Sequence, residues 1–112
     1  MDDMRAQSAM QMIMHAGDAR ALAMQALDAL NTFGVEEARE KLKEANKEVV
    51  EAHKIQTEAI VDETRGIPAE YSVLFCHAQD TLMTVNTEIN LANHLVEMTA
   101  ALDERIKKLE NK

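Results

Sequence analysis

The stretch "NTFGVEEAREKLKEANKEVVEAHKIQTEAIVDETRGIP", from Asn31 to Pro68, decides the fold that this sequence predicts. It begins and ends with turn-forming residues, and between them apolar residues recur at spacings of three and four. Such spacing places them on one stripe of a helix. They are Val35, Ala38, Leu42, Ala45, Val49, Ala52 and Ala59, with Gln56 on the same line. The stretch therefore predicts an amphipathic helix over 35–65, bounded by two turns.

The segments on either side are each long enough for one further helix. The 112 residues include only three Gly and one Pro, and 3% are aromatic, which is typical of helices rather than of a sheet. We predict helices over 3–31 and 69–110, with Pro68 in the first turn of the latter and Glu70 just behind it. Short connections make consecutive helices antiparallel. The prediction is one all-α domain over 1–112, an antiparallel up-down-up three-helix bundle.

The N-terminal helix is rich in methionine, with Met residues on more than one side. Met24, Leu27 and Leu30 are predicted to continue its buried face. Methionine fills gaps in cores and subunit contacts, and we favour that role over a promiscuous binding surface. Gly17 lies inside this helix, where glycine costs ~1 kcal/mol relative to Ala. A glycine there could let another backbone or a phosphate come close, or it could permit tight packing, and tight packing is the explanation we favour for Gly17.

Charge and cysteine content exclude several classes of function. The formal net charge is −8, and no basic stripe is present, which disfavours nucleic acid and anionic membranes as partners. Cys76 is the single cysteine and cannot form an internal disulfide, as expected in a reducing cytosol. The first residues lack a basic region followed by an apolar run, so we expect no signal peptide, no membrane span and a cytoplasmic location.

The last predicted helix has two apolar faces. At ~100° per residue, one face collects the core candidates Phe75, Ala78, Leu82, Val85, Ile89, Ala92 and Val96. A second stripe on the far side surrounds Asp80 and consists of Val73, Cys76, Met83, Thr84, Thr87, Leu91 and Met98. A monomeric bundle needs only one stripe, so the second predicts self-association along this helix. His77 would lie at the edge of the contact.

Asp80 would then meet its copies near a symmetry axis. Two unit charges ~4 Å apart repel by about 4 kcal/mol at an effective dielectric constant of 20. Three such terms are comparable to a total domain stability of ~5–15 kcal/mol. Protonation or a bound cation must relieve the repulsion, and an all-oxygen site selects a hard ion such as Mg²⁺ or Ca²⁺. Asp80 is therefore our candidate metal ligand.

The segment "HAQDTLMT", from His77 to Thr84, resembles "HAQDHLMT" in the IIA proteins of the lactose/cellobiose-type sugar phosphotransferase system. "HAGDARALA" (15–23) and "EAHKIQTEAI" (51–60) are also similar to family segments, in the same order along the chain. The resemblance implies a cytoplasmic phosphocarrier that is built as a three-helix bundle and forms a homotrimer.

The resemblance also implies roles for individual residues and partners. His77 falls on the phosphorylated histidine, and Asp80 falls on the aspartate that binds a metal ion, here expected to be Mg²⁺, shared by three subunits. Phosphoryl would arrive from the histidine-containing phosphocarrier protein and leave to a cysteine of the cognate IIB component during disaccharide uptake. Neutral imidazole is a suitable nucleophile for such transfer. By helix phase, Thr84 and Gln79 are further candidate donors to the phosphoryl oxygens.

Several points stay open. A non-catalytic oligomeric helical interaction module is the main alternative, although Asp80 would destabilise a purely structural contact. A metal-dependent hydrolase is disfavoured, because the chain has no Glu-x-x-His pattern. Many members of the family carry a second histidine directly after the aspartate, and here that position is Thr81, so the role of that histidine does not carry over. The sequence does not determine the roles of Asp18 and Arg20, the sugar or the ion. We expect Cys76 to be a small buried hydrophobe. His15, His53 and His94 are expected to be structural or surface residues.

Overall fold

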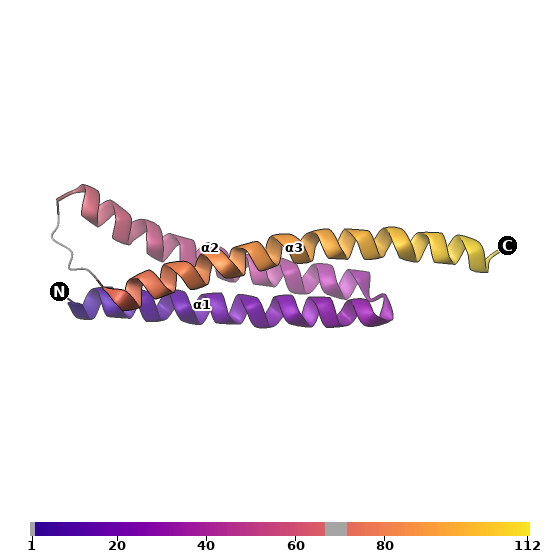
Figure 1. The fold of residues 1–112 in the computed structure, drawn as a ribbon, viewed down its shortest axis with the longest axis horizontal. Coiled ribbons are helices and arrows are strands. Elements are labelled where there is room, and N and C mark those ends of the chain that lie inside the picture. Colours follow the sequence, from indigo (N-terminus) through magenta and orange to yellow (C-terminus); the bar gives the residue numbers. More distant parts are fainter. Residues whose placement is uncertain (1, 67–71) are drawn as a thin grey trace.

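The computed structural model describes residues 2–66 and 72–112, which form three long helices and no strand (Figure 1). The helices are α1 (Asp2–Ala29), α2 (Val35–Thr64) and α3 (Val73–Glu110), with a short 3₁₀ helix η1 (Leu30–Thr32) after α1. The prediction of an all-α chain with three long helices is confirmed.

The helices lie side by side in an elongated particle that measures 68 × 20 × 18 Å (Figure 1). From the N-terminus, α1 runs the length of the body and α2 returns beside it. α3 then runs in the same direction as α1, and its C-terminal part projects past the turn between α1 and α2. The end of α3 thus leaves the body, while its beginning lies against α1.

The turn between α1 and α2 depends on a close backbone approach. Phe33 has a φ of 58°, in the left-handed region, and its N–H donates to the carbonyl of Leu30 at 3.0 Å. The N–H of Gly34 donates to the carbonyl of Ala29 at 2.9 Å. A Cβ atom at Gly34 would lie 3.1 Å from that carbonyl oxygen. Gly34 therefore allows α2 to start directly after η1 and to fold back on α1.

The core is built largely from small side chains. Each helix contributes one stripe, and the buried residues are Ala9, Met12, Ala16, Ala19, Ala23, Ala26, Ala29, Ala38, Leu42, Ala45, Val49, Ala52, Phe75, Ala78, Leu82, Val85, Ile89, Ala92 and Val96. All seven core residues predicted on the last helix are buried, as are the five central ones on the middle helix. Alanines allow α1 to approach its neighbours closely, because interaxial distance depends on the side chains at the contact.

The prediction for the buried face of α1 is wrong at one residue and only partly right at two. Met24 is 44% exposed, whereas Leu27 and Leu30 pack only partly buried against the core. The alanine stripe faces inward instead, and Met24 lies about 100° round the helix from Ala23.

The start of α3 also differs from the prediction. Ser72 is extended, with φ −131° and ψ 117°, and its side-chain oxygen accepts a hydrogen bond from the N–H of Phe75 at 3.1 Å. Ser72 is therefore the N-cap and the helix begins at Val73, since a side chain that satisfies a free N–H stabilises the first turn there. Pro68 and Glu70, which were expected in the first turn, lie outside the described residues.

Side-chain pairs between helices fix how the three helices align along the bundle. They are His15 with Glu48 (α1–α2, 2.8 Å), Arg20 with Glu88 (α1–α3, 2.7 Å) and Arg39 with Glu97 (α2–α3, 2.9 Å). The hydrogen bond from Arg39 lowers the pKa of Glu97 below its ordinary value. Arg20, to which the sequence assigned no role, therefore links α1 to α3.

Candidate functional site

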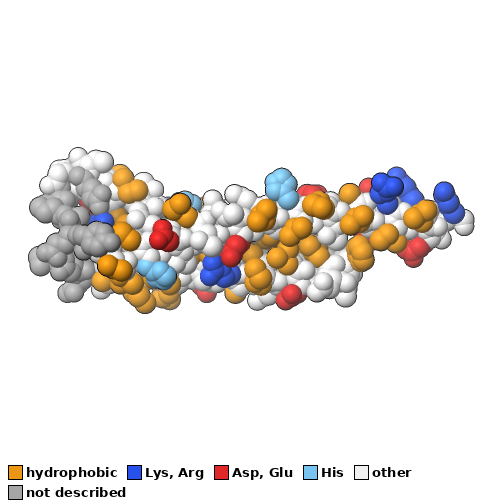
Figure 2. Space-filling view, viewed as in Figure 1, with side chains coloured by type: hydrophobic (Ala, Val, Ile, Leu, Met, Phe, Trp, Pro, Cys, Tyr) orange, Lys and Arg blue, Asp and Glu red, His pale blue; other side chains and the backbone are white. Residues whose placement is uncertain are grey.

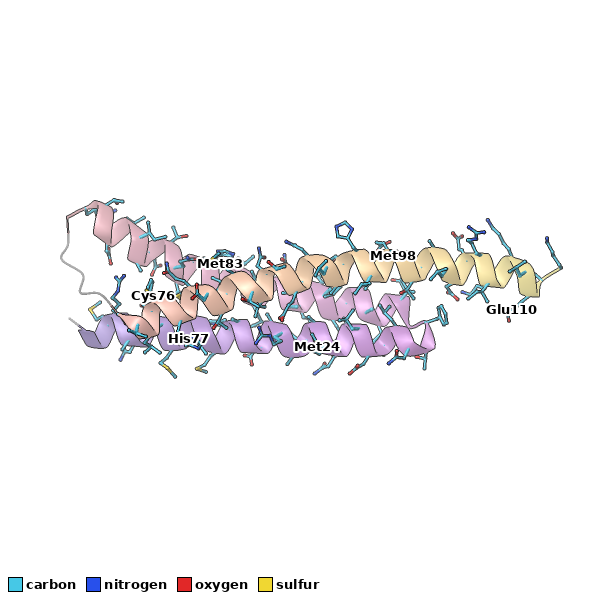
Figure 3. The ribbon with its side chains drawn as sticks, in the orientation of Figure 1. Met24, Cys76, His77, Met83, Met98 and Glu110 are labelled. Atoms are coloured by element: carbon cyan, nitrogen blue, oxygen red, sulfur yellow. The ribbon has the colours of Figure 1, made fainter. Side chains whose placement is uncertain are left out.

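His77 lies in the second turn of α3 and is exposed. Figure 3 shows His77 on the side of α3 toward α1, whereas Cys76 and Met83 lie on the side toward α2. Glu88, three turns further along the same edge of α3, contacts Arg20 of α1, in agreement with this placement. The imidazole therefore stands at an open edge between two helices.

Two contacts between α1 and α3 identify the segment of α1 that lies alongside His77. At the start of α3, the guanidinium of Arg5 stacks over the ring of Phe75, 4.2 Å from its centroid. Further along, Arg20 bonds Glu88. His77 lies between these contacts on α3, so the α1 residues between Arg5 and Arg20 run past it.

An exposed stripe at spacings of four and three begins on that part of α1 and continues beyond Arg20. Met10, Met14 and Met24 are 49%, 63% and 44% exposed, and Gly17 and Ala21 are exposed between them. We call these five residues the outer stripe of α1. A Cβ at Gly17 would have no heavy atom within 4 Å. Packing against other residues of the same chain therefore does not explain this glycine, and that prediction is wrong.

Asp80 is exposed one turn after His77 and lies about 60° round the helix from it. Around it, the exposed apolar residues of α3 face away from the chain's own core. Val73, Met83, Leu91 and Met98 are 70%, 65%, 59% and 60% exposed. Together with the exposed Asp80, Thr84 and Thr87, we call them the outer stripe of α3. Figure 2 shows hydrophobic side chains along this face. The second stripe expected from the sequence is thus uncovered in the single chain.

The hydroxyl groups beside the site are engaged with the helix backbone. Thr81 donates to the carbonyl of His77 at 2.8 Å, and Thr84 donates to the carbonyl of Asp80 at 2.9 Å. Gln79 is half-buried and, two residues from His77, falls on the opposite side of α3. In this conformation the Thr81 hydroxyl is therefore engaged with the backbone of its own helix.

The remaining cysteine and histidines lie outside this arrangement. Cys76 is a free, half-buried thiol on the other side of α3. His15 Nδ1 is 2.8 Å from a Glu48 carboxylate oxygen and links two helices, while His53 and His94 are exposed. Structural and surface roles are what the sequence predicted for these three histidines.

Among the described residues, Asp80 has no set of metal-ligating neighbours. Over residues 2–66 and 72–112, no group of three or more His, Cys, Asp or Glu side chains could hold a metal ion. In the same described part of the chain, no helix is long and apolar enough to cross a membrane.

Comparison with known proteins identifies the family. The family model for the lactose/cellobiose-specific IIA subunit of the phosphotransferase system matches residues 7–100. The chain belongs to this family. It is 39% identical over 95 residues to the lichenan-specific phosphotransferase enzyme IIA component of Bacillus subtilis, covering 85% of this chain and 86% of that protein. It is 36% identical over 101 residues to the lactose-specific EIIA component of Lacticaseibacillus casei, covering 90% and 87%.

The fold agrees with this membership. The crystal structure of the cellobiose-specific enzyme IIA from Bacillus anthracis superimposes with a TM-score of 0.83 at 39% identity, covering 88% of this chain and 90% of that one. The matched span contains His77, Asp80 and both outer stripes. The chain is thus a IIA component of lactose/cellobiose-type sugar transport, a phosphotransfer protein whose role implies a cognate IIB partner.

Proposed function

We propose that this IIA component carries the phosphoryl group on His77 during disaccharide uptake in the cytoplasm. The observation that supports it is the exposure of His77 at an open edge of α3, within the span matched by the family. An acceptor that serves two protein partners in turn must be reachable from outside, and a buried histidine would not be. His15, which is engaged with Glu48, is less suited to this role.

The transfer needs two displacements at phosphorus. In the first, the lone pair of an imidazole nitrogen of His77 attacks the phosphorus held by the histidine-containing phosphocarrier protein. A new P–N bond forms while the donor's P–N bond breaks and its imidazole leaves. In the second, a cysteine thiolate of IIB attacks, the P–S bond forms, and His77 leaves with its electron pair. Phosphoryl transfer depends mainly on in-line positioning and electrostatic stabilisation, so no general base is required of this chain.

Positioning would come from surfaces beside His77. The outer stripe of α1 carries three exposed methionines, and Met10 and Met14 lie on the part of α1 that runs past His77. Methionine side chains are flexible and polarisable, and they suit surfaces that bind more than one partner. We therefore assign the outer stripe of α1 to contacts with the phosphoryl donor and with IIB. This assignment differs from the core or subunit role that the sequence favoured for the methionines.

We further propose that the chain forms a homotrimer through the outer stripe of α3. This stripe is apolar except at Asp80, Thr84 and Thr87, and its apolar side chains are exposed among the residues that the structure describes. In a parallel trimer the three Asp80 carboxylates would converge and provide only oxygen ligands, which suits Mg²⁺. When bound, the ion would offset the repulsion between the carboxylates, which amounts to about 4 kcal/mol per pair at ~4 Å.

The labelling experiment uses phosphoenolpyruvate, the general phosphotransfer enzyme and the histidine-containing phosphocarrier protein. Wild-type chain should acquire an acid-labile, base-stable phosphoryl group, and His77→Ala should lose it with an unchanged circular dichroism spectrum. His94→Ala is the matched control, because His94 is exposed on the same helix. Label that survives in His77→Ala, or acid-stable label as on Ser or Thr, would refute the assignment. A chain that is never labelled would favour the non-catalytic interaction module.

A further inference from the structure

A hollow of about 710 Å³ lies between the turn that joins α1 to α2 and the inner side of the projecting part of α3. In Figure 1 this turn lies at the opposite end of the body from the start of α3. Glu97, the first α3 residue in the lining, comes 20 residues after His77, or about 30 Å along the helix. The α3 wall continues past residue 100, where the family match ends. The hollow is therefore remote from the site of phosphoryl transfer.

An exposed aromatic side chain lines this hollow. Of the two phenylalanines, Phe75 is buried and Phe33 is 42% exposed. The backbone of Phe33 is left-handed, a conformation that is unfavourable for a bulky side chain and that glycine or asparagine adopts more easily. Folding of the turn therefore does not by itself favour a phenylalanine here. Exposed aromatic residues suit the role of anchors, because they bury a large area when a partner covers them.

The two walls of the hollow are acidic. Five carboxylates and two cations line it, which gives the lining a formal charge of −3. Arg39 bonds two of the carboxylates, and Lys107 lies 3.1 Å from a third. Glu37 of α2 and Glu104 of α3, one on each wall, take part in no ion pair among the described residues. A ligand that complements the hollow therefore carries positive charge.

The lining suits a segment of a protein better than a metal ion. Over residues 2–66 and 72–112, no three His, Cys, Asp or Glu side chains are grouped so that they could hold a metal ion. Val35, Ala100 and Ala101 add apolar surface to the lining. Lys and Arg side chains match such a mixture, because their stems pack on apolar surface while the charged ends reach carboxylates. The matching ligand is thus a segment in which Lys or Arg flank an apolar residue.

Sugar uptake supplies a partner with segments of this kind. The cytoplasmic loops of membrane proteins carry an excess of Lys and Arg beside apolar membrane-spanning helices. We propose that the hollow docks a basic cytoplasmic loop of the membrane transporter that this IIA component serves. Phe33 packs on an apolar side chain of the loop, and Glu37 and Glu104 bind its cations. The inference rests on the proposed role in uptake, and it adds a contact that keeps the chain at the transporter while His77 exchanges partners.

The first test measures capture of the full chain by inside-out membrane vesicles in a centrifugation assay. Vesicles from cells that express the cognate transporter should capture the chain, and vesicles from cells without the transporter should not. Both kinds come from cells that lack IIB, so capture does not depend on the site at His77. Because both contain the same lipids, the comparison separates a protein loop from a lipid surface. Equal capture by both kinds, or capture by neither, would overturn the proposal.

Replacing Phe33 tests the anchor. Phe33→Asn removes the ring, and asparagine tolerates the left-handed backbone, so the circular dichroism spectrum and the urea midpoint should remain close to those of the wild type. Capture should weaken at least about 10-fold, as is typical when an anchoring side chain is lost from an interface. Unchanged capture by this variant would show that the hollow is not the docking surface.

Neutralising the two unpaired carboxylates tests the charge complementarity. Glu37→Gln/Glu104→Gln should weaken capture by about 3- to 10-fold and reduce its dependence on salt, because exposed ion pairs are individually weak and are screened. Glu40→Gln/Glu110→Gln is the matched control, since it makes the same charge change at exposed residues of the same two helices outside the hollow. The control should bind as the wild type does. Equal capture of the two double variants would contradict the proposal.

Phosphoryl transfer is scored separately from docking. Phe33→Asn should acquire label on His77 at the wild-type rate in solution, because the hollow lies about 30 Å from the imidazole. A chain that is captured by the vesicles but is never labelled would refute the phosphocarrier role and leave the docking surface in place. A chain that is labelled normally but is not captured would refute the docking surface alone.

Discussion

Replacing one leucine on each face of α3 tests whether the helix serves two different contacts. Leu82 is fully buried in the core of the chain, whereas Leu91 is 59% exposed on the outer stripe of α3. Both lie in the same uninterrupted helix, so the substitution to Ala changes helix propensity equally at both sites. Any difference between the variants therefore reports the surroundings of the two side chains.

The two substitutions are expected to change different quantities, the free energy of unfolding for Leu82→Ala and the trimer dissociation constant for Leu91→Ala. Leu82→Ala should lower the free energy of unfolding by about 2–5 kcal/mol, since it removes buried contacts and leaves a cavity. That is a large share of the ~5–15 kcal/mol typical of a domain. Leu91→Ala should lower it by less than about 1 kcal/mol in the dilute single chain. In a trimer, covering the exposed part of each leucine is worth ~1–2 kcal/mol, so loss at three copies should raise the trimer dissociation constant by about 10²–10⁴.

The assay combines urea unfolding, at concentrations where the chain is monomeric, with sedimentation equilibrium at higher concentrations. Leu82→Ala should shift the unfolding midpoint, and Leu91→Ala should shift the mass distribution. Thr87→Ala, on the same stripe but with a smaller side chain, should have a weaker effect on mass than Leu91→Ala. Leu91→Ala could leave the mass unchanged, or it could destabilise the monomer as much as Leu82→Ala does. Either result would refute the conclusion that one face of α3 lies in the core and the other in a subunit contact.

The remaining predictions concern the metal, the glycines and pH. Asp80→Asn should strengthen self-association in EDTA and abolish its dependence on Mg²⁺, as measured by sedimentation; unchanged Mg²⁺ dependence would exclude Asp80 as ligand. Gly34→Ala should lower the free energy of unfolding by about 1–3 kcal/mol, because its Cβ would lie 3.1 Å from a backbone carbonyl oxygen. Gly17→Ala, in open space, should raise it by about 1 kcal/mol in urea unfolding. Arg39 lowers the pKa of Glu97, so the stabilisation by this pair is present above the ordinary glutamate pKa and is lost as pH falls through the lowered value. The difference in melting temperature between wild type and Glu97→Gln should therefore vanish in acid.

The sequence by itself determined the helices and the two faces of α3. Spacings of three and four fix which residues share a face of a helix, whatever surrounds it. The large side chains on the core face of α3, such as Phe75 and Leu82, made that face unambiguous. His77 and Asp80 could therefore be placed at the edge and on the outside of α3 without coordinates, and the surrounding motif indicated the family.

Tertiary structure decided the orientation of α1 and the surroundings of His77. Helix α1 has two apolar stripes, one of alanines and one of methionines. Hydropathy alone predicts that the stripe with the larger side chains is the buried one. The alanines face inward because helices can approach closely only where side chains are small, which leaves Met24 and Gly17 outside. The part of α1 that runs past His77 is set by contacts between residues far apart in sequence, such as Arg20 with Glu88. Helical periodicity carries no information about such alignment, because it repeats identically along each helix.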